Sequence, residues 1–307
     1  MLVNGVRILE PAYERGFAVP AFNISDYAML RGCLEACEEV RSPMIVSIHP
    51  SEWELVGDEF LASVLELARS ATIPVAVQLD HGATFEQVMG AIRLGFTSVM
   101  IDGSLLPYDE NVAICRKVAE AAHAVGVSVE GEIGTIGARD IKSAEEMADI
   151  VYTTPSEARD FVRDTGVDYL AVAVGTCHGV YPAGVEPKLK LDLLREIKDS
   201  TPVPLVLHGG SGTPDAEVSE AVTLGIAKVN ISADIKVSYF NRLREVLLNP
   251  AQREPHDIYP LALETMMATV RHKVEVLGAV GSADFYPESA AAREASPLRD
   301  LQAAVQA

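Results

Sequence analysis

The chain has 307 residues, 49% of them hydrophobic, and carries a formal net charge of -19 at pH 7. It can therefore fill a large core, but such an acidic chain does not neutralise a phosphate backbone, which excludes nucleic acid as a partner. A small phosphorylated ligand is not excluded, because backbone amides in a local pocket can bind phosphate.

The cysteines and apolar runs indicate a cytoplasmic protein. Cys33, Cys37, Cys115 and Cys177 form neither a CxxC pair nor a disulfide framework, which is typical of a reducing compartment. We interpret the first three as core residues. No apolar run approaches the roughly 18 residues of a membrane helix, and the N-terminus does not have the features of a signal peptide, so no membrane partner is expected.

Short apolar runs alternate with longer amphipathic stretches from Val19 to Asp234, the pattern of repeated βα units around a parallel sheet. The runs predicted as strands are Ala18 to Phe22, Met44 to Ile48, Val75 to Leu79, Ser98 to Ile101, Val127 to Gly131, Tyr169 to Val174, Val203 to Leu207 and Lys228 to Ile231. Eight such units favour an α/β protein of the closed (β/α)8 type, a TIM barrel.

Helices are predicted between and beyond these strands. Asp58 to Ser70 and Glu110 to Ala124 have apolar faces at helical spacing. Tyr259 to Leu277 forms an additional C-terminal helix that could pack on a neighbouring subunit, and we expect a homodimer or homotetramer. No linker divides the chain, so residues 1–280 are predicted as one barrel domain and residues 281–307 as a loose or partner-contacting tail.

Polar side chains follow every predicted strand, and in a barrel these strand ends converge on one mouth. They are Asn23, His49, Asp80 with His81, Asp102, Glu132, His178, His208 and the segment Asn230 to Asp234. Three imidazoles with an open fourth position are a frequent catalytic zinc arrangement, and His81, His178 and His208 could supply them. The alternative is that each histidine satisfies a separate local hydrogen bond.

A phosphate site is predicted beside the last two strands. His208 opens the turn HGGSG, where amides of Gly209, Gly210 and Ser211 can point at an anion. Asn230 to Ser232 end the eighth strand, and phosphate sites in these barrels are commonly built from the seventh and eighth loops.

A metal, a phosphate anchor and carboxylates together indicate proton removal beside a ketone, giving an enediolate that a metal ion would stabilise. This is the chemistry of an aldolase or an isomerase. We interpret Lys228 as structural because it precedes the body of its strand, so no lysine is predicted to form a Schiff base.

The motifs AFNI, LDHG, IDGS followed by LPYDENV, EGEIG, GTCHGVY, VLHGGSG and KVNIS occur here in the order seen in class II, zinc-dependent ketose-bisphosphate aldolases. The chain resembles most the branch with tagatose-bisphosphate aldolase and the shorter fructose-bisphosphate aldolases. This resemblance covers about residues 1 to 280. It implies Zn²⁺ as the cofactor and allows a monovalent cation as well.

The resemblance also implies roles for individual residues. Zinc would bind His81, His178 and His208, and Asp80 would serve the hydroxyl at the cleaved bond. Glu132 and Asp102 would support the metal or bind it in an alternative position. Dihydroxyacetone phosphate would contact Gly179, the segment Gly209 to Ser211 and the residues Asn230, Ile231, Ser232 and Ala233, with Asn23 nearby. Asp140, where glutamate is usual, would move the carbon-bound proton.

Several departures from the family pattern lie at the two ends of the substrate. Ala233 replaces a threonine that commonly assists the phosphate. His49 replaces a small hydroxyl residue near the distal phosphate, and His256 replaces an arginine that a neighbouring subunit commonly offers there. Losing that arginine removes a permanent charge, so the aldehyde half is expected to differ from the usual phosphorylated group. We interpret Cys177, where a small residue is common, as a packing substitution.

The sequence thus predicts reversible cleavage of a ketose 1-phosphate or 1,6-bisphosphate to dihydroxyacetone phosphate and an aldehyde. Two alternatives stay open. One is a metal-dependent sugar-phosphate isomerase or epimerase on the same barrel, and the other is a noncatalytic sugar-phosphate-binding subunit.

Overall fold

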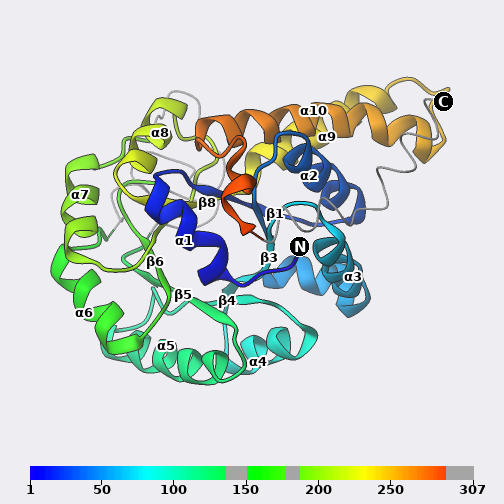
Figure 1. Cartoon of the computed structure of the whole chain (residues 1–307). Helices are drawn as coiled ribbons and strands as arrows, with labels where there is room; N and C mark the ends of the chain where they lie inside the picture. The colour runs from blue at the N-terminus through cyan, green and yellow to red at the C-terminus, as the bar shows by residue number, and fades with distance from the viewer. Residues whose placement is uncertain (136–150, 177–186, 288–307) are drawn as a thin grey trace.

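The computed structural model describes residues 1–135, 151–176 and 187–287, and in it eight parallel strands form a closed barrel in the order β1 to β8 (Figure 1). The strands are β1 (Val19–Asn23), β2 (Met44–Ile48), β3 (Val75–Gly82), β4 (Ser98–Ile101), β5 (Ser128–Ile133), β6 (Tyr169–Val172), β7 (Leu205–Leu207) and β8 (Ile226–Ile231). The predicted (β/α)8 barrel is confirmed.

The helices that follow the strands cover the outside of the barrel, and α1 precedes them (Figure 1). Their bounds are α1 (Gly5–Arg15), α2 (Tyr27–Glu39), α3 (Pro50–Ser70), α4 (Phe85–Leu94), α5 (Tyr108–His123), α6 (Pro155–Thr165), α7 (Leu191–Ser200), α8 (Asp215–Thr223), α9 (Ala233–Leu247) and α10 (Pro255–Val276). Side chains cap the starts of α1, α2, α3, α4 and α6. Asp26, for example, accepts a hydrogen bond from the Met29 amide at 2.7 Å.

Several strand bounds differ from the predicted ones, and three of these differences involve residues of the site. β3 continues through Asp80 and His81 to Gly82, and β5 includes Glu132. β8 begins at Ile226, so Lys228 lies inside the strand instead of preceding it. The sequence did not predict these bounds, because hydrophobicity alone does not detect strand positions whose side chains are polar and face the inside of the barrel.

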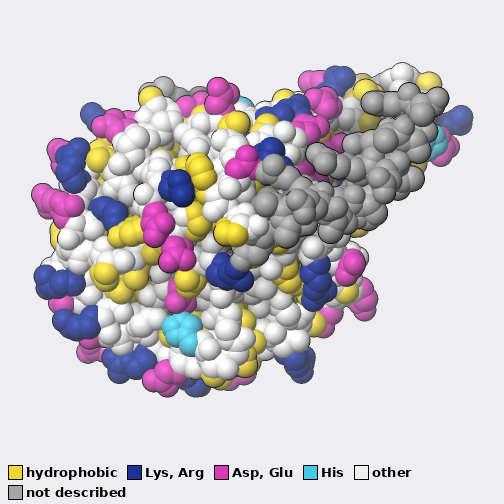
Figure 2. Space-filling model, viewed as in Figure 1, with side chains coloured by type: hydrophobic (Ala, Val, Ile, Leu, Met, Phe, Trp, Pro, Cys, Tyr) yellow, Lys and Arg dark blue, Asp and Glu magenta, His cyan; other side chains and the backbone are white. Residues whose placement is uncertain are grey.

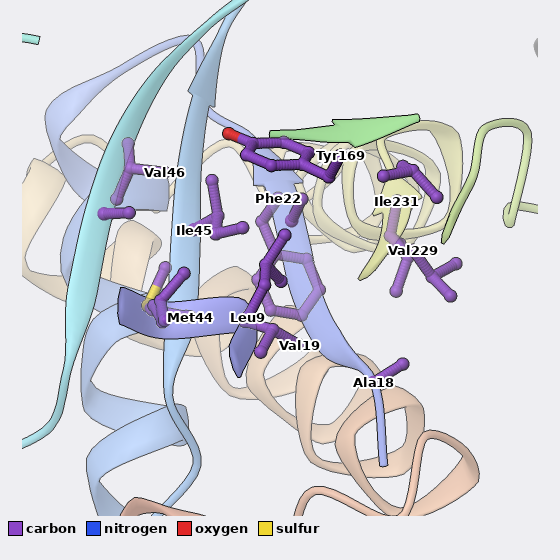
Figure 3. Close-up of a cluster of buried hydrophobic side chains, with 14 of the residues drawn as sticks. Leu9, Ala18, Val19, Phe22, Met44, Ile45, Val46, Tyr169, Val229 and Ile231 are labelled. Carbon is purple, nitrogen blue, oxygen red and sulfur yellow. The ribbon is translucent and has the colours of Figure 1, made fainter. Parts of the chain in front are cut away.

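The core consists of aliphatic and aromatic side chains from the strands and the helices around them (Figure 3). Phe22 of β1, Ile45 of β2 and Val229 of β8 are fully buried in it. Such continuous apolar runs are expected for parallel strands that are covered on both faces.

Helix α1 closes the end of the barrel at which the strands begin (Figure 1). The residues before it pair with the start of β3, since the Val3 amide donates to the Val75 carbonyl at 2.9 Å. Gly5 lies so close to Tyr169 that an added Cβ would be 2.3 Å from the tyrosine hydroxyl. In the described residues, the opposite end, where the strands finish, is therefore the end left for a site.

Helices α9 and α10 pair with each other and extend beyond the barrel as an arm (Figures 1 and 2). α10 starts four residues before the predicted helix. Beyond it, Ser282–Phe285 form a short 3-10 helix, and buried Tyr286 donates to the Ile8 carbonyl at 2.5 Å. The first residues of the predicted tail are thus packed on α1. No helix in the described ranges is long and apolar enough to cross a membrane.

Candidate active site at the barrel mouth

Asp80 and His81 both face the mouth because β3 is irregular at its end. The pairing of β3 with β4 shifts between Leu79 and Gly82, and His81 has a φ of 52°. Neighbouring residues of a regular strand point to opposite faces. A left-handed conformation is costly for a residue other than glycine, so this backbone is held in place by its surroundings.

Two histidines meet at this point. His81 and His208, which follows β7, have ring centroids 4.8 Å apart in an edge-to-face arrangement. Nδ1 of His81 lies 2.7 Å from an oxygen of Asp102, the residue that follows β4. Nδ1 of His208 lies 3.2 Å from Oε2 of Glu132 on β5. The structure therefore brings together four of the residues that the sequence predicted from separate strand ends.

Carboxylates surround both imidazoles and govern their charge. Burial would lower the pKa of His208, but Glu132 and Glu130 raise it to about 10. Burial likewise opposes the charge on His81, and Asp80 and Asp102 raise its pKa above the usual value. A cation bound here would thus take the place of a proton on the imidazoles. The neighbouring carboxylates that favour the protonated rings would also stabilise the cation.

Asp80 is held from two sides by amide groups. It is almost fully buried, and its two oxygens accept hydrogen bonds from Asn23 at 2.7 Å and Asn230 at 3.1 Å. Burial would raise its pKa, yet His81, His208 and Lys228 together with the Asn23 hydrogen bond hold the pKa below the usual range. The carboxylate is therefore ionised and fixed, with Oδ1 3.9 Å from Nε2 of His81.

The donor set fits a divalent metal. Two overlapping groups of side chains have ligand atoms that all lie within 4.8 Å of one another: Asp80, His81 and His208, and His81, Asp102 and Glu132. Oε2 of Glu132 is buried and lies 3.2 Å from Nδ1 of His208 and 3.9 Å from Nδ1 of His81. Imidazole nitrogens and carboxylate oxygens are the ligands of catalytic zinc, which suits a mixed site of this kind.

The loops after β7 and β8 form one unit beside these histidines. The Ser211 hydroxyl accepts hydrogen bonds from the amides of Ser232 and Asp234, both at 3.2 Å. The Gly210 amide donates to the Asn230 carbonyl, and a Cβ at Gly210 would lie 2.4 Å from the Val229 side chain. Helix α9 begins directly after Ser232, so its N-terminus joins the glycine-rich turn in a place suited to an anion.

His49 lies beside the metal candidate and also begins a helix. Its ring centroid is 6.1 Å from that of His81. Its Nδ1 accepts from the Ser51 amide at 3.1 Å, while Glu52 accepts from the His49 amide at 3.0 Å, a reciprocal cap of α3. A ring nitrogen that accepts a hydrogen bond carries no proton, so this cap favours the tautomer with hydrogen on Nε2.

The remaining predicted site residues fall into two groups, those outside the described residues and those that the structure places. Asp140, His178, Gly179 and Cys177 lie outside the described residues. His256 is on the first turn of α10, where its side chain is 78% exposed on the arm. Ile231 is buried in the core, and Ala233 is the first residue of α9.

Sequence reasoning gave no site role to two charged residues beneath the mouth: Glu130 was not singled out, and Lys228 was interpreted as structural. Both are fully buried, and Oε2 of Glu130 lies 2.7 Å from Nζ of Lys228. The signal for Glu130 was its spacing of two from Glu132, which places both side chains on the same face of a strand.

Comparison with known proteins assigns the chain to a family. Residues 3–282 match the family described as fructose-bisphosphate aldolase class-II. A fructose-bisphosphate aldolase of Thermus caldophilus is 38% identical over 305 residues, with 92% of this chain and 100% of that protein covered.

Solved structures agree with this assignment. The YdjI aldolase of Escherichia coli K12 superposes with a TM-score of 0.82 at 31% identity, covering 92% of this chain and 100% of that one. A putative fructose-1,6-bisphosphate aldolase of Coccidioides immitis gives a TM-score of 0.83 at 27% identity, covering 92% and 98%. The chain belongs to the class II fructose-bisphosphate aldolase family and is thus a carbon-carbon lyase of the aldolase type.

Proposed function

We propose that the protein catalyses zinc-dependent, reversible cleavage of a ketose 1-phosphate or 1,6-bisphosphate into dihydroxyacetone phosphate and an aldehyde. The observation that carries this proposal is the arrangement of Asp80 beside His81 and His208. An ionised carboxylate, fixed by two asparagines, stands within 3.9 Å of an imidazole nitrogen in a group fit for a metal. A proton acceptor next to an electrophile is what a retro-aldol reaction needs.

Zinc held by His81, His208 and, by family resemblance, His178 would polarise the substrate carbonyl and stabilise the negative charge that develops when the bond breaks. Glu132 and Asp102 would support it. The chain's own residues do the rest. Asp80 takes the proton of the C4 hydroxyl while the C3–C4 bond breaks, and Asn23 and Asn230 keep its carboxylate in position.

Asn230 also has a second task. Its side-chain oxygen is buried and has no hydrogen-bond partner among the described residues, so it can accept a hydrogen bond from a substrate hydroxyl. The phosphate of the dihydroxyacetone half binds where Gly209, Gly210 and Ser211 meet the start of α9, with Gly179 contributing from the sixth loop. Asp140 returns the proton to carbon in this scheme.

The aldehyde half is the less conventional end of the substrate. His49 lies on this side of the mouth, and its cap favours a neutral ring that donates from Nε2. A neutral donor suits a hydroxyl or carbonyl oxygen better than a phosphate. We therefore favour a ketose whose distal end is not phosphorylated. If the protein does accept a distal phosphate, His256 of a neighbouring subunit is the contact to test.

The experiment is a coupled assay. Protein loaded with zinc is mixed with fructose and tagatose bisphosphates and with singly phosphorylated ketoses, and release of dihydroxyacetone phosphate is followed through a reductase. We expect turnover with at least one ketose phosphate and its loss by about 100-fold or more in Asp80→Asn, since general base catalysis contributes about 10² to 10⁴-fold. Asp192→Asn, at an exposed aspartate on α7, is the matched control.

Three results would contradict the proposal. Undiminished turnover in Asp80→Asn or His208→Ala would remove the catalytic assignment. An isomerised ketose without cleavage, detected by NMR, would indicate the isomerase instead. Protein that binds no zinc and turns over nothing would point to a noncatalytic binding subunit.

We also propose a homodimer or homotetramer built through the arm. Phe240, Leu248 and Leu261 on or beside α9 and α10 are exposed apolar side chains. Light scattering of the purified protein should give two or four times the monomer mass, and a monomeric mass at micromolar concentration would contradict this.

A further inference from the structure

Glu130 is a buried carboxylate directly beneath the candidate metal group. One oxygen lies 2.7 Å from Nε2 of His208, and the other lies 2.7 Å from Nζ of Lys228 and 2.7 Å from Nε2 of Gln78. All four side chains are at most 1% exposed. They come from β3, β5, β8 and the end of β7, so the carboxylate connects four parts of the barrel wall.

Stability alone is a poor reason for this arrangement. Burying an ion pair costs several kcal/mol of desolvation per ion, and apolar residues of similar size would often be as stable. The contacts instead suit a positioning role, because Lys228 and Gln78 both donate to Oε2 of Glu130 and leave Oε1 to His208.

An ionised carboxylate beside Nε2 of His208 fixes the orientation of that ring. The Nε2 hydrogen is donated to Glu130, and Nδ1 is turned towards Glu132, 3.2 Å away, and the His81 ring. In His81 the two nitrogens have exchanged roles, because Nδ1 faces the supporting carboxylate, Asp102. In each ring the nitrogen away from the supporting carboxylate faces the centre of the group.

We propose that Glu130, held by Lys228 and Gln78, is a positioning residue that directs Nδ1 of His208 at the metal ion and strengthens metal binding. The inference rests on the proposed zinc site. Metal-bound histidines commonly donate their second ring N–H to a carboxylate, and removal of that partner typically weakens metal affinity about 10 to 100-fold. Lys228 acts through Glu130, by holding its carboxylate in place.

The test measures metal affinity directly. Apo protein is titrated with Zn²⁺ in competition with a chromogenic chelator, and with Co²⁺ to follow the absorption bands of the bound ion. We expect Glu130→Gln to weaken Zn²⁺ binding about 10 to 100-fold and to alter the Co²⁺ spectrum. Lys228→Met should act in the same direction. Thr165→Val is the matched control, because it removes a buried side-chain hydrogen bond, to the Phe161 carbonyl, on α6 outside the barrel.

Folding is controlled separately. Glu130→Gln leaves Lys228 as an unpaired buried charge, which can unfold a protein, so Glu130→Gln/Lys228→Met removes both charges together. Circular dichroism and thermal melts of the apo forms identify the folded variants. A folded double variant with wild-type Zn²⁺ affinity and an unchanged Co²⁺ spectrum would overturn the inference while leaving the proposed function intact. Wild-type protein that binds no zinc would instead overturn the proposed function.

Discussion

Nδ1 of His81 lies 2.7 Å from Oδ2 of Asp102, so the residue that follows β4 supports the histidine next to the last residue of β3. Asp102 is itself held, because its other oxygen accepts hydrogen bonds from the Ser104 amide at 3.0 Å and hydroxyl at 2.7 Å. The contact leaves Nε2 of His81 on the side of Asp80. Asp102 thus acts through His81 in this structure, although it also belongs to one possible metal group.

Replacing Asp102 should therefore impair the metal site without unfolding the protein. We expect Asp102→Asn to weaken zinc binding and lower kcat by about 10 to 100-fold, because His81 loses its charged partner. The measurements are chelator competition and the coupled assay. If zinc affinity and kcat both equal those of Asp192→Asn, the supporting role of Asp102 is refuted.

The phosphate loops should be intolerant of a side chain at Gly210. In Gly210→Ala the new Cβ would lie 2.4 Å from Cγ1 of Val229 and 2.9 Å from the Asn230 carbonyl oxygen, so the loop must move. Overpacking of this kind costs about 1 to 3 kcal/mol, and we expect a higher KM for the phosphorylated substrate.

The same substitution at Gly90 is the control for that prediction. Gly90 is inside α4, where a Cβ would make only an ordinary contact with Trp53 at 3.5 Å. Gly90→Ala should leave KM unchanged and raise stability by roughly 0.5 to 1 kcal/mol, since alanine favours helix. Equal KM values for both variants would show that the phosphate does not bind at Gly210.

His49 combines a structural and a proposed substrate role, and two substitutions separate them. His49→Ala removes the cap of α3 and should cost about 1 kcal/mol of unfolding free energy, whereas His49→Asn keeps a capping side chain. Both remove the Nε2 donor and should raise KM for the ketose without changing the affinity for dihydroxyacetone phosphate. Unchanged KM in the stable His49→Asn variant would exclude His49 from the aldehyde side.

Three of the four thiols should be inert in the native protein. Cys33, Cys37 and Cys115 are buried, and burial raises the pKa of all three thiols, that of Cys115 to about 12. The reactive thiolate is therefore scarce at pH 8. Titration with a disulfide reagent should modify at most one thiol in the folded wild type, none in Cys177→Ser, and all four of the wild type in denaturant. Rapid reaction of more than one native thiol would contradict the buried environment.

The barrel and part of its mouth could be predicted from the sequence because parallel strands are apolar throughout and end in polar residues. Asp80, His81, Asp102, Glu132 and His208 were found in this way, and the structure places them together. The bulge in β3 was harder to locate, because a left-handed φ at His81 depends on tertiary contacts and not on local sequence.

The role of Glu130 and Lys228 beneath the mouth could not be predicted from the sequence. Each lies inside a strand, and its partner lies 98 residues away in the chain. Nothing local distinguishes a buried charge with a partner from a solvated one. The capping role of His49 could not be predicted either, because it depends on the orientation of the ring, which the sequence does not show.

The closure of the barrel by α1 affects how the substrate enters and how the products leave. With Gly5 packed against Tyr169 and Val3 paired with β3, the described residues leave the barrel open only where its strands finish, so a ketose and both of its fragments would pass through that opening. If the phosphate binds at the loops after β7 and β8, the aldehyde lies between the bound dihydroxyacetone phosphate and the solvent. The aldehyde must then depart before dihydroxyacetone phosphate, and the reverse condensation must load its two reactants in the opposite order.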